Sequence, residues 1–238
     1  MIDRDKVKAF WDARADTYRS LKFESIANLE QDPQNLELKI RLESEKVFAY
    51  LETVAGKTVL DLGAGVGQWA FRFVDRGAAD VTAVEYSARL ARIGAREAER
   101  RGVSNLRFIV SPAEDVSLDG QFDIVFISGL FVYMNDDQAE KLTPRLATLC
   151  HSDTRVVVRD GTGLRERFEI DDRPSEHLGT SYSATYRTAA QYQAMFERSG
   201  FELLRHENMF DERCPLNKFA ETRLRIYEFG RRREVRDA

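Results

Sequence analysis

The sequence predicts an α/β fold with a doubly wound, mostly parallel sheet, and three observations support this prediction. First, short apolar segments alternate with amphipathic segments of helical periodicity from Lys57 onward. Second, the first of these apolar segments leads directly into a loop with glycines at Gly63, Gly65 and Gly67. Third, the next apolar segment ends in an acidic residue, Glu85. In such a sheet helices cover both faces, and ligands bind beyond the carboxyl ends of the strands.

The N-terminal region predicts two helices that precede the sheet. Apolar and aromatic residues recur at helical spacing over residues 3–21. A second helix is expected to begin after Asp32, whose side chain can cap it, with Pro33 in its first position. We therefore expect residues 1–56 to form a helical cap and residues 57–238 to form the core.

Five strands are expected in the first part of the core, at residues 58–63, 80–86, 106–110, 122–128 and 155–160. Three of the segments between them have the apolar periodicity of helices. A further helix is expected at 189–200, with strands at 201–210 and 221–229. The polar stretch at about 161–187 is longer than an ordinary connection, and we expect an irregular insertion over the binding face.

Composition and charge restrict the class of protein. Hydrophobic residues make up 43% of the 238 residues, but no apolar run approaches the roughly 20 residues of a membrane helix. The net charge of −4 argues against broad electrostatic binding to nucleic acid. The N-terminus lacks the apolar segment of a signal peptide, so a cytoplasmic location is expected. Cys150 and Cys214 are expected to be free thiols.

Three kinds of ligand compete for the glycine-rich loop. A Walker phosphate loop requires Lys followed by Ser or Thr after its last glycine, but Gln68 and Trp69 stand there. The dinucleotide fingerprint requires two residues between its second and third glycines, and only one separates Gly65 from Gly67. The form D-L-G-x-G-x-G suits a nucleoside that carries an amino acid and no pyrophosphate, because carboxylates can accept from its ammonium group. Glu85 can accept from both hydroxyls of a ribose.

Four motifs then occur in order along the chain: VLDLGAGVGQWA, AVEYS, SPAEDV and FDIVFISGLFVYM. They resemble the successive motifs of the class I S-adenosylmethionine-dependent methyltransferases, firmly from Lys57 to Asp160 and more loosely beyond. The resemblance implies a Rossmann-like core, a seven-stranded sheet whose last strand is antiparallel, and S-adenosylmethionine as the cofactor. The segment FWDARADTY resembles the helical lid with which many small-molecule methyltransferases cover this cofactor.

The implied cofactor-binding residues are Asp61, Gly63, Ala64, Gly65, Glu85, Tyr86, Ala113, Glu114, Ser128 and Gly129. The resemblance puts the methionine part of the cofactor at the glycine loop, the ribose at the end of the second strand and the adenine after the third strand. Pro112 departs from the pattern, since the family often has an aspartate there. In the lid, Trp11 and Tyr18 would contact cofactor or acceptor, or else serve as packing anchors. Arg41 would pair with the cofactor carboxylate, whereas Trp69 is expected to pack in its helix.

Methyl transfer requires an acceptor atom in line with the methyl group, and a base only where the acceptor loses its proton in that step. Asp160 ends the fifth strand and is the first candidate for an orienting or basic carboxylate. His177 lies in the insertion and is a second candidate, with a surface position as the alternative. Tyr133 is a third candidate, and it stands where many relatives have a histidine. No metal constellation is evident. Residues expected to line the acceptor pocket are Tyr182, Tyr186, Arg187, Asn217 and Lys218.

The expected reaction is S-adenosylmethionine-dependent methyl transfer to an oxygen or nitrogen of a small molecule, such as a sugar, an amino acid or a secondary-metabolite intermediate. Two alternatives stay open: a methyltransferase that acts on protein or RNA, and a non-catalytic, cofactor-binding regulatory protein. The fourth strand ends in ISGL rather than the Asn/Asp-Pro-Pro motif of nucleic-acid amine methylases. The expected partner is therefore a small-molecule acceptor, with neither nucleic acid nor membrane, and a homodimer is compatible with the sequence.

Overall fold

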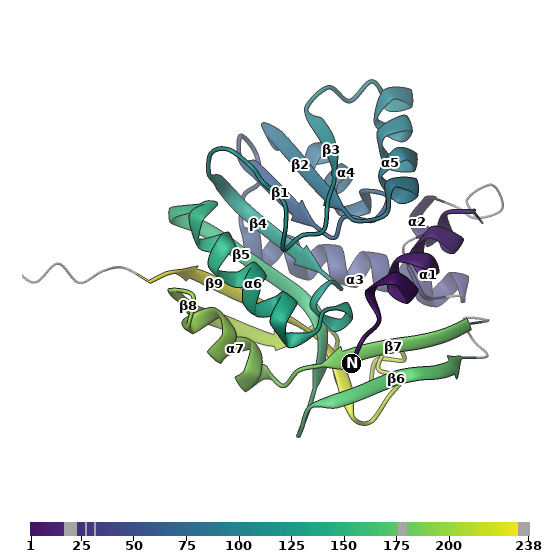
Figure 1. The fold of residues 1–238 in the computed structure, drawn as a ribbon. Coiled ribbons are helices and arrows are strands. Elements are labelled where there is room, and N and C mark those ends of the chain that lie inside the picture. The colour runs from purple at the N-terminus through teal and green to yellow at the C-terminus, as the bar shows by residue number, and fades with distance from the viewer. Residues whose placement is uncertain (17–22, 27, 31, 176–179, 233–238) are drawn as a thin grey trace, which may run out of the picture.

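The computed structural model describes residues 1–16, 23–26, 28–30, 32–175 and 180–232 (Figure 1). Its α-helices are α1 (Arg4–Asp16), α2 (Phe23–Ile26), α3 (Pro33–Leu51), α4 (Gln68–Asp75), α5 (Ala88–Arg101), α6 (Asp136–Thr148) and α7 (Ala189–Glu197). Its strands are β1 (Thr58–Leu62), β2 (Asp80–Glu85), β3 (Leu106–Val110), β4 (Phe122–Ser128), β5 (Cys150–Gly163), β6 (Phe168–Ser175), β7 (Thr180–Tyr186), β8 (Phe201–Asn208) and β9 (Thr222–Arg231). A 3₁₀ turn, η2 (Phe131–Tyr133), follows β4. Within these described ranges, no helix combines the length and the apolar character that a membrane crossing requires.

Seven of the described strands form one sheet, in the order β3-β2-β1-β4-β5-β9-β8. β1 pairs in parallel with β2 and β4, and β4 pairs in parallel with β5. β9 runs antiparallel to both β5 and β8, so the predicted fold class is confirmed, including the antiparallel last strand. From β1 the chain proceeds outwards to β2 and β3 and then returns to β4 on the other side of β1. This reversal of strand order creates a crevice for ligands at the carboxyl ends of β1 and β4.

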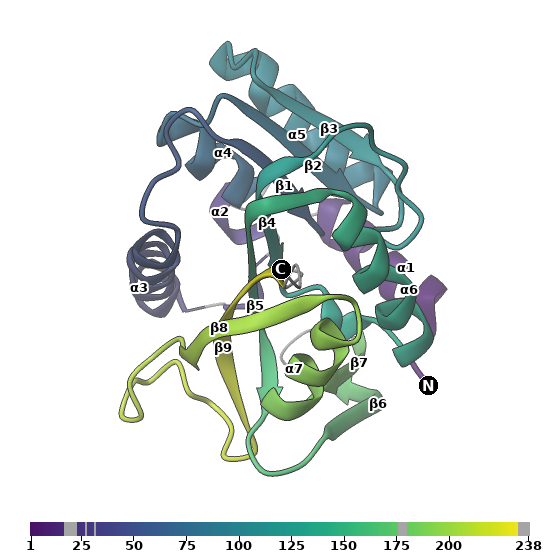
Figure 2. The same cartoon turned by 90° about the vertical axis from the view of Figure 1, so that its left-hand side faces the viewer.

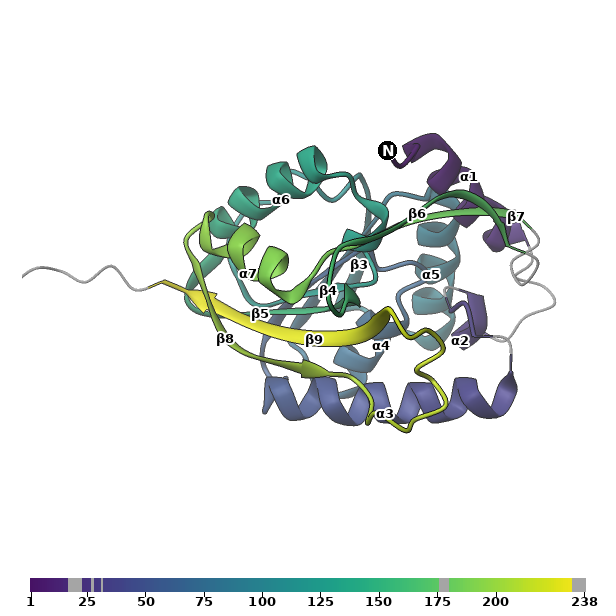
Figure 3. The same ribbon diagram turned by 90° about the horizontal axis from the view of Figure 1, so that it is seen from below.

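The sheet is apolar on both faces, as a parallel sheet covered by helices on both sides requires. Val59 and Phe126 pack on one face with side chains of α3 and α4, among them Trp69, whose ring centroid lies 4.9 Å from that of Phe126. Leu60 and Val125, the alternate residues, pack on the other face with α6 and α7. Figures 2 and 3 show α3 on one side of β5 and α6 on the other. The two apolar layers hold the strand ends in fixed positions.

The helix α1 lies near the carboxyl ends of the strands and is attached to the loops that follow them (Figure 1). Ile2 and Asn135 exchange two hydrogen bonds of 2.8 Å. The Ser87 hydroxyl donates to the carboxylate of Asp12. The helix ends at Asp16, and the remainder of the predicted first helix lies outside the described residues. These contacts hold α1 over the crevice at the carboxyl ends of the strands.

The second predicted helix begins where the sequence indicated. The side chain of Asp32 accepts a hydrogen bond of 2.8 Å from the amide of Asn35, and Pro33 occupies the first position of α3. The buried Val47 and Leu51 of α3 belong to the core cluster that covers one face of the sheet. This helix is therefore part of the core packing as well as of the predicted cap region.

The stretch at 161–187 forms a β-hairpin for most of its length, so the prediction of an irregular insertion was wrong. β5 continues to Gly163, and β6 and β7 pair antiparallel as a separate two-stranded sheet, with Phe168 opposite Tyr186. The high polarity of the segment outweighed an alternation typical of a strand, in which Tyr182, Ala184 and Tyr186 alternate with residues that carry a hydroxyl group. β7 runs beside α1 and thereby extends the wall of the crevice (Figure 1).

Candidate active site

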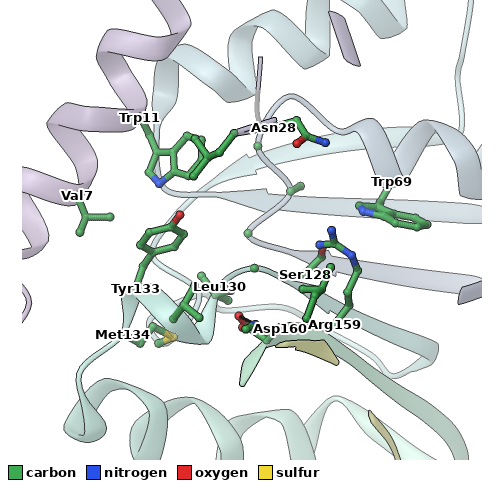
Figure 4. A pocket seen from close by; sticks show the side chains of 18 of the residues that line it. Val7, Trp11, Asn28, Trp69, Ser128, Leu130, Tyr133, Met134, Arg159 and Asp160 are labelled. Carbon is green, nitrogen blue, oxygen red and sulfur yellow. Dashed lines mark hydrogen bonds between the residues drawn. The ribbon is translucent and has the colours of Figure 1, made fainter. Parts of the chain in front are cut away.

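A cavity of about 1040 Å³ lies at the carboxyl ends of the strands, and α1 forms part of its wall (Figure 4). Further wall residues come from α3, from the glycine loop, from the loops after β2 to β4 and from the hairpin β6–β7. Trp11 of α1 stands edge-on to Tyr133, with ring centroids 5.7 Å apart. Small-molecule pockets typically have about 300–1,000 Å³, so this cavity has the size of a large small-molecule site.

Glu85 holds the glycine loop in place. Gly63 and Gly65 have φ angles of 74° and 59°, in the left-handed region that glycine adopts without strain. The amide of Gly65 donates to Glu85 Oε2 at 2.8 Å, and the amide of Ser87 donates to Oε1 at 2.7 Å. Burial raises the pKa of Glu85, although these amide donors favour its ionised form. One buried carboxylate thus joins the loop to the next strand and still has lone pairs for ligand hydroxyls.

Asp61 is the next-to-last residue of β1 and lines the cavity, although the residue is only 1% exposed. Burial raises its pKa to about 7, against the effect of a hydrogen bond from the backbone of Ala70. Its Oδ2 has no hydrogen-bond partner among the described residues. A buried acceptor without a donor costs about 1–3 kcal/mol. Asp61 is therefore placed to accept from a cationic group of a ligand.

Tyr86, Ala113 and Glu114 lie at one end of the cavity, where Arg4 of α1 links two of them. The Arg4 guanidinium forms a salt bridge of 2.8 Å with Glu114 and lies 5.4 Å from the ring centroid of Tyr86. Glu114 is buried and also accepts a hydrogen bond of 3.1 Å from Gln138. The carboxylate thus holds α1 against the loop after β3, and Tyr86 and Ala113 line the cavity.

Ser128 ends β4 and Gly129 follows it, and both line the cavity together with Arg159 of β5. Figure 4 shows Ser128 and Arg159 side by side. Arg159 donates to Ser128 Oγ at 2.7 Å and forms a salt bridge with Glu43 of α3. The amide of Gly129 donates to the carbonyl of Arg159 at 2.8 Å. A buried guanidinium therefore lies at the carboxyl end of β4.

Asp160 is completely buried at the cavity wall and fixes the turn η2. Its Oδ2 accepts a hydrogen bond of 2.7 Å from the amide of Phe131, and its Oδ1 accepts one of 2.8 Å from the amide of Gly161. Burial raises its pKa to about 6. Tyr133, at the end of η2, directs its hydroxyl into the cavity on the side of Trp11 (Figure 4). Asp160 can thus orient the Tyr133 turn and still accept a proton.

The predicted acceptor-pocket residues do not all lie in the cavity. Tyr186, Asn217 and Lys218 line it. Arg187 is buried elsewhere and donates to backbone carbonyls of the loop between β4 and α6, so the prediction that it lines the acceptor pocket was wrong. Tyr182 belongs to β7.

Four further predictions concern single residues and metal ligands. Arg41 is 58% exposed at its side chain and pairs with Glu45 at 3.5 Å, so the predicted contact with a cofactor carboxylate was wrong. Tyr18 and His177 lie outside the described residues. In the described part of the chain, no three His, Cys, Asp or Glu side chains gather as metal ligands.

Sequence reasoning missed Lys39, Glu43 and Arg159, which meet in the cavity wall. A signal for Arg159 existed. It follows Val157 by two residues on a buried strand, and such a position faces the interior, so a charge there requires a reason. For Lys39 and Glu43 the spacing of one helical turn shows only that they share a face of α3.

The geometry can be compared with known proteins. Residues 59–153 match a family model described as a methyltransferase domain. A phosphoethanolamine N-methyltransferase 1 of Triticum aestivum is 28% identical over 164 residues, or 67% of this chain and 31% of that protein, so the chain spans about a third of the length of this curated relative. The structure of a 1,6-didemethyltoxoflavin N1-methyltransferase of Burkholderia thailandensis superimposes with a TM-score of 0.67 at 17% identity, covering 98% of this chain and 92% of that one. The structure of a magnesium protoporphyrin IX methyltransferase of Synechocystis PCC 6803 superimposes with a TM-score of 0.67 at 17% identity, covering 96% of this chain and 100% of that one. These likenesses confirm the Rossmann-like methyltransferase fold.

Proposed function

We propose that this chain, whose residues 59–153 match a methyltransferase domain, transfers the methyl group of S-adenosylmethionine to an oxygen or nitrogen atom of a small molecule. The observation that carries the proposal is the joint geometry of the glycine loop, Asp61 and Glu85 in one cavity. The loop lets a ligand approach the backbone, Asp61 has an oxygen without a partner, and Glu85 ends the next strand. A nucleoside with a ribose diol and an ammonium group requires these features.

The proposed cofactor position follows from these groups. Glu85 would accept from the ribose hydroxyls, and Asp61 would accept from the ammonium group. The adenine would lie along Ala113, at the end of the cavity that α1 covers. The sulfonium would then lie near Ser128 and Gly129, at the end of β4.

When bound, the cofactor would supply a sulfonium methyl group. A lone pair of the acceptor would form the new bond to the methyl carbon, while the electron pair of the carbon–sulfur bond stays on sulfur. The residues of the chain would mainly align the acceptor and exclude water, which can supply much of the acceleration. Tyr133 would orient the acceptor through its hydroxyl. Asp160 would hold the Tyr133 turn and, with a pKa raised to about 6, would be ionised at neutral pH and able to take a proton from an oxygen acceptor.

A small acceptor is favoured by the way the cavity is covered. α1 and the hairpin β6–β7 both contribute to its wall, and Trp11 meets Tyr133 across it. The names of similar proteins also refer to small molecules, namely phosphoethanolamine, 1,6-didemethyltoxoflavin and magnesium protoporphyrin IX. We further propose that residues 1–56 act as the cap of this cavity. The cytoplasmic location and the homodimer remain predictions.

The proposal is tested by calorimetric titration of the purified chain with S-adenosylmethionine, S-adenosylhomocysteine and NAD. Binding of both sulfur nucleosides and not of NAD is expected. A labelled methyl group should then move from the cofactor into a small-molecule pool. Label in protein or RNA would favour a macromolecular acceptor, and binding without any transfer would favour a regulatory protein. Absence of binding by the folded chain would contradict the proposal.

The affinity for S-adenosylhomocysteine is expected to rise roughly tenfold from about pH 5.5 to about pH 7.5. In the free chain the pKa of Asp61 is raised to about 7, so this carboxyl is mostly protonated at the lower pH. A bound ammonium group would favour the ionised form, so binding must displace a proton below pH 7 and becomes tighter as the pH rises. Calorimetry over this range measures the effect. This part of the pH dependence should disappear in the variant Asp61→Asn. It should also disappear when the ligand is 5′-methylthioadenosine, which lacks the amino acid. If the affinity still rose with pH in both controls, the assignment of Asp61 would be contradicted.

A further inference from the structure

A cluster of charged side chains lies in the cavity wall where α3 meets the end of β5. It consists of Lys39, Arg159 and Lys218 with the carboxylates of Glu43 and Glu30, and all five residues line the cavity. Arg159 pairs with Glu43, and Lys218 pairs with Glu30 at 2.7 Å. Lys39 lies 4.0 Å from the same carboxylate that Arg159 already uses. Three positive charges thus face two negative charges, which leaves an excess of one positive charge.

The geometry of Arg159 shows that its donors are incompletely used. The residue is only 8% exposed. Ser128 and Glu43 accept from its terminal nitrogens, whereas its Nε has no hydrogen-bond partner among the described residues. A guanidinium has five N–H donors in a planar fork that matches an oxyanion. Figure 4 shows the side chain extending from β5 past Ser128 into the cavity.

The ammonium of Lys39 is held toward the same region. It donates to Asn28 Oδ1 at 3.0 Å, and only 21% of its side chain is exposed. Burial, followed by the nearby Arg159, lowers the pKa of Lys39, and only the carboxylates of Glu43 and Glu30 oppose this effect. A half-buried positive charge that shares its counterion with a second cation is costly, and an anion supplied by a ligand would relieve that cost.

We propose that Lys39 and Arg159 form a binding site for an oxyanion, which is the carboxylate or phosphate group of a molecule held in the cavity. Asn28 keeps the lysine in place. Glu43 lies close to both cations, but its single negative charge neutralises only one of them. The anion would accept from Arg159 Nε and from Lys39 Nζ. The site would select anionic ligands over neutral ligands of the same shape.

Two molecules could supply the anion. Resting on the proposed function, these are the amino-acid carboxylate of the cofactor and an anionic group of the methyl acceptor. Either anion would accept hydrogen bonds from Lys39 and Arg159. The two cases differ in whether the site is already filled by the cofactor before the acceptor binds. The arms of the experiment separate them.

The experiment is calorimetric titration of the full chain and of Lys39→Met with S-adenosylhomocysteine, with 5′-methylthioadenosine, and with inorganic phosphate at constant ionic strength. Lys39→Met removes the excess charge and leaves the Arg159–Glu43 pair intact. Lys46→Met is the matched control, since Lys46 lies on the same helix but pairs with Glu207 outside the cavity. Arg159→Gln is the second variant, and thermal unfolding checks that each variant is folded.

If the cofactor carboxylate fills the site, Lys39→Met should weaken the binding of S-adenosylhomocysteine by about tenfold. The affinity for 5′-methylthioadenosine, which lacks this carboxylate, should stay unchanged. If the acceptor fills it, both nucleosides should bind normally, and phosphate should bind the S-adenosylhomocysteine complex of the wild type about tenfold more tightly than that of the variant. The inference is overturned if Lys39→Met and Arg159→Gln affect none of these affinities more than Lys46→Met does. If neither nucleoside binds the wild type, the proposed function fails, and the phosphate titration of the free chain still decides the oxyanion site.

Discussion

Glu85→Ala is expected to weaken S-adenosylhomocysteine binding by about a hundredfold or more. The substitution removes the carboxylate that accepts from the amides of Gly65 and Ser87, and in the proposed complex also the acceptor of the ribose hydroxyls. Hydrogen bonds to a charged group contribute about 1.5–3 kcal/mol each, so the loss of two corresponds to this change in the dissociation constant. Calorimetric titration of the wild type and the variant measures it.

A control separates the ribose contact from general damage to the fold. Glu99→Ala removes a glutamate from the exposed surface of α5 and should bind as the wild type does. Thermal unfolding should show Glu85→Ala folded, since Leu62 and Val84 still hold the strand ends in the core. If the folded Glu85→Ala variant bound S-adenosylhomocysteine within a factor of about three of the wild type, the proposed cofactor position would be wrong.

Arg187→Met is expected to lower the free energy of unfolding by about 3 kcal/mol. Arg187 is 2% exposed and donates to the carbonyl of Phe131 at 2.7 Å, to that of Met134 at 2.8 Å and to the carboxylate of Asp136 at 2.6 Å. A methionine of similar length leaves the Met134 carbonyl without this donor, at about 1–3 kcal/mol, and leaves the Phe131 carbonyl with the amide of Met134 at 3.1 Å in place of two donors. Urea unfolding followed by circular dichroism measures the change, and the melting temperature should fall by roughly 6–12 °C.

The matched control is Arg167→Met, because Arg167 also pairs with Asp136, at 2.7 Å, but has 29% of its side chain exposed. Its hydrogen bonds to described residues go to the carboxylates of Asp136 and Glu169 and to no carbonyl. Exposed ion pairs contribute about 0–1 kcal/mol, so this variant should lose less than about 1 kcal/mol. Equal losses in the two variants would show that the carboxylate pair, and not the two carbonyls, determines the stability of the loop. Since η2 carries Tyr133, Arg187→Met should also loosen this wall of the cavity.

The sequence predicted the central part of the fold well, because the relevant signals are local. The alternation of apolar strands and helices gave the parallel sheet, and the cap formed by Asp32 and Pro33 gave the start of α3. Glycines at positions of positive φ, such as Gly63 and Gly65, are recognisable because other residues rarely adopt that conformation. The hairpin β6–β7 was missed because its polar composition outweighed its alternation.

The candidate site was predicted only in part. Asp61 and Glu85 stand at ends of strands, so the sequence could place them at one edge of the sheet. Arg41 and Arg187 were assigned to the cavity from position alone, and the structure places both elsewhere, because the direction of a side chain on a helix or strand depends on what packs against it. Lys39 and Arg159 were not singled out, although they lie in the cavity wall.

By itself, the sequence determined the order of the elements, the glycine loop and the acidic strand ends, since these depend on the backbone preferences and burial of neighbouring residues. Only the tertiary structure decided that Glu43 and Arg159, 116 positions apart, share a salt bridge in the cavity, and that Arg187 supports a loop that precedes it by about fifty residues. Such contacts arise when packed layers bring distant segments together. No local pattern of residues encodes them, because charged side chains interact across space and without a fixed spacing along the chain.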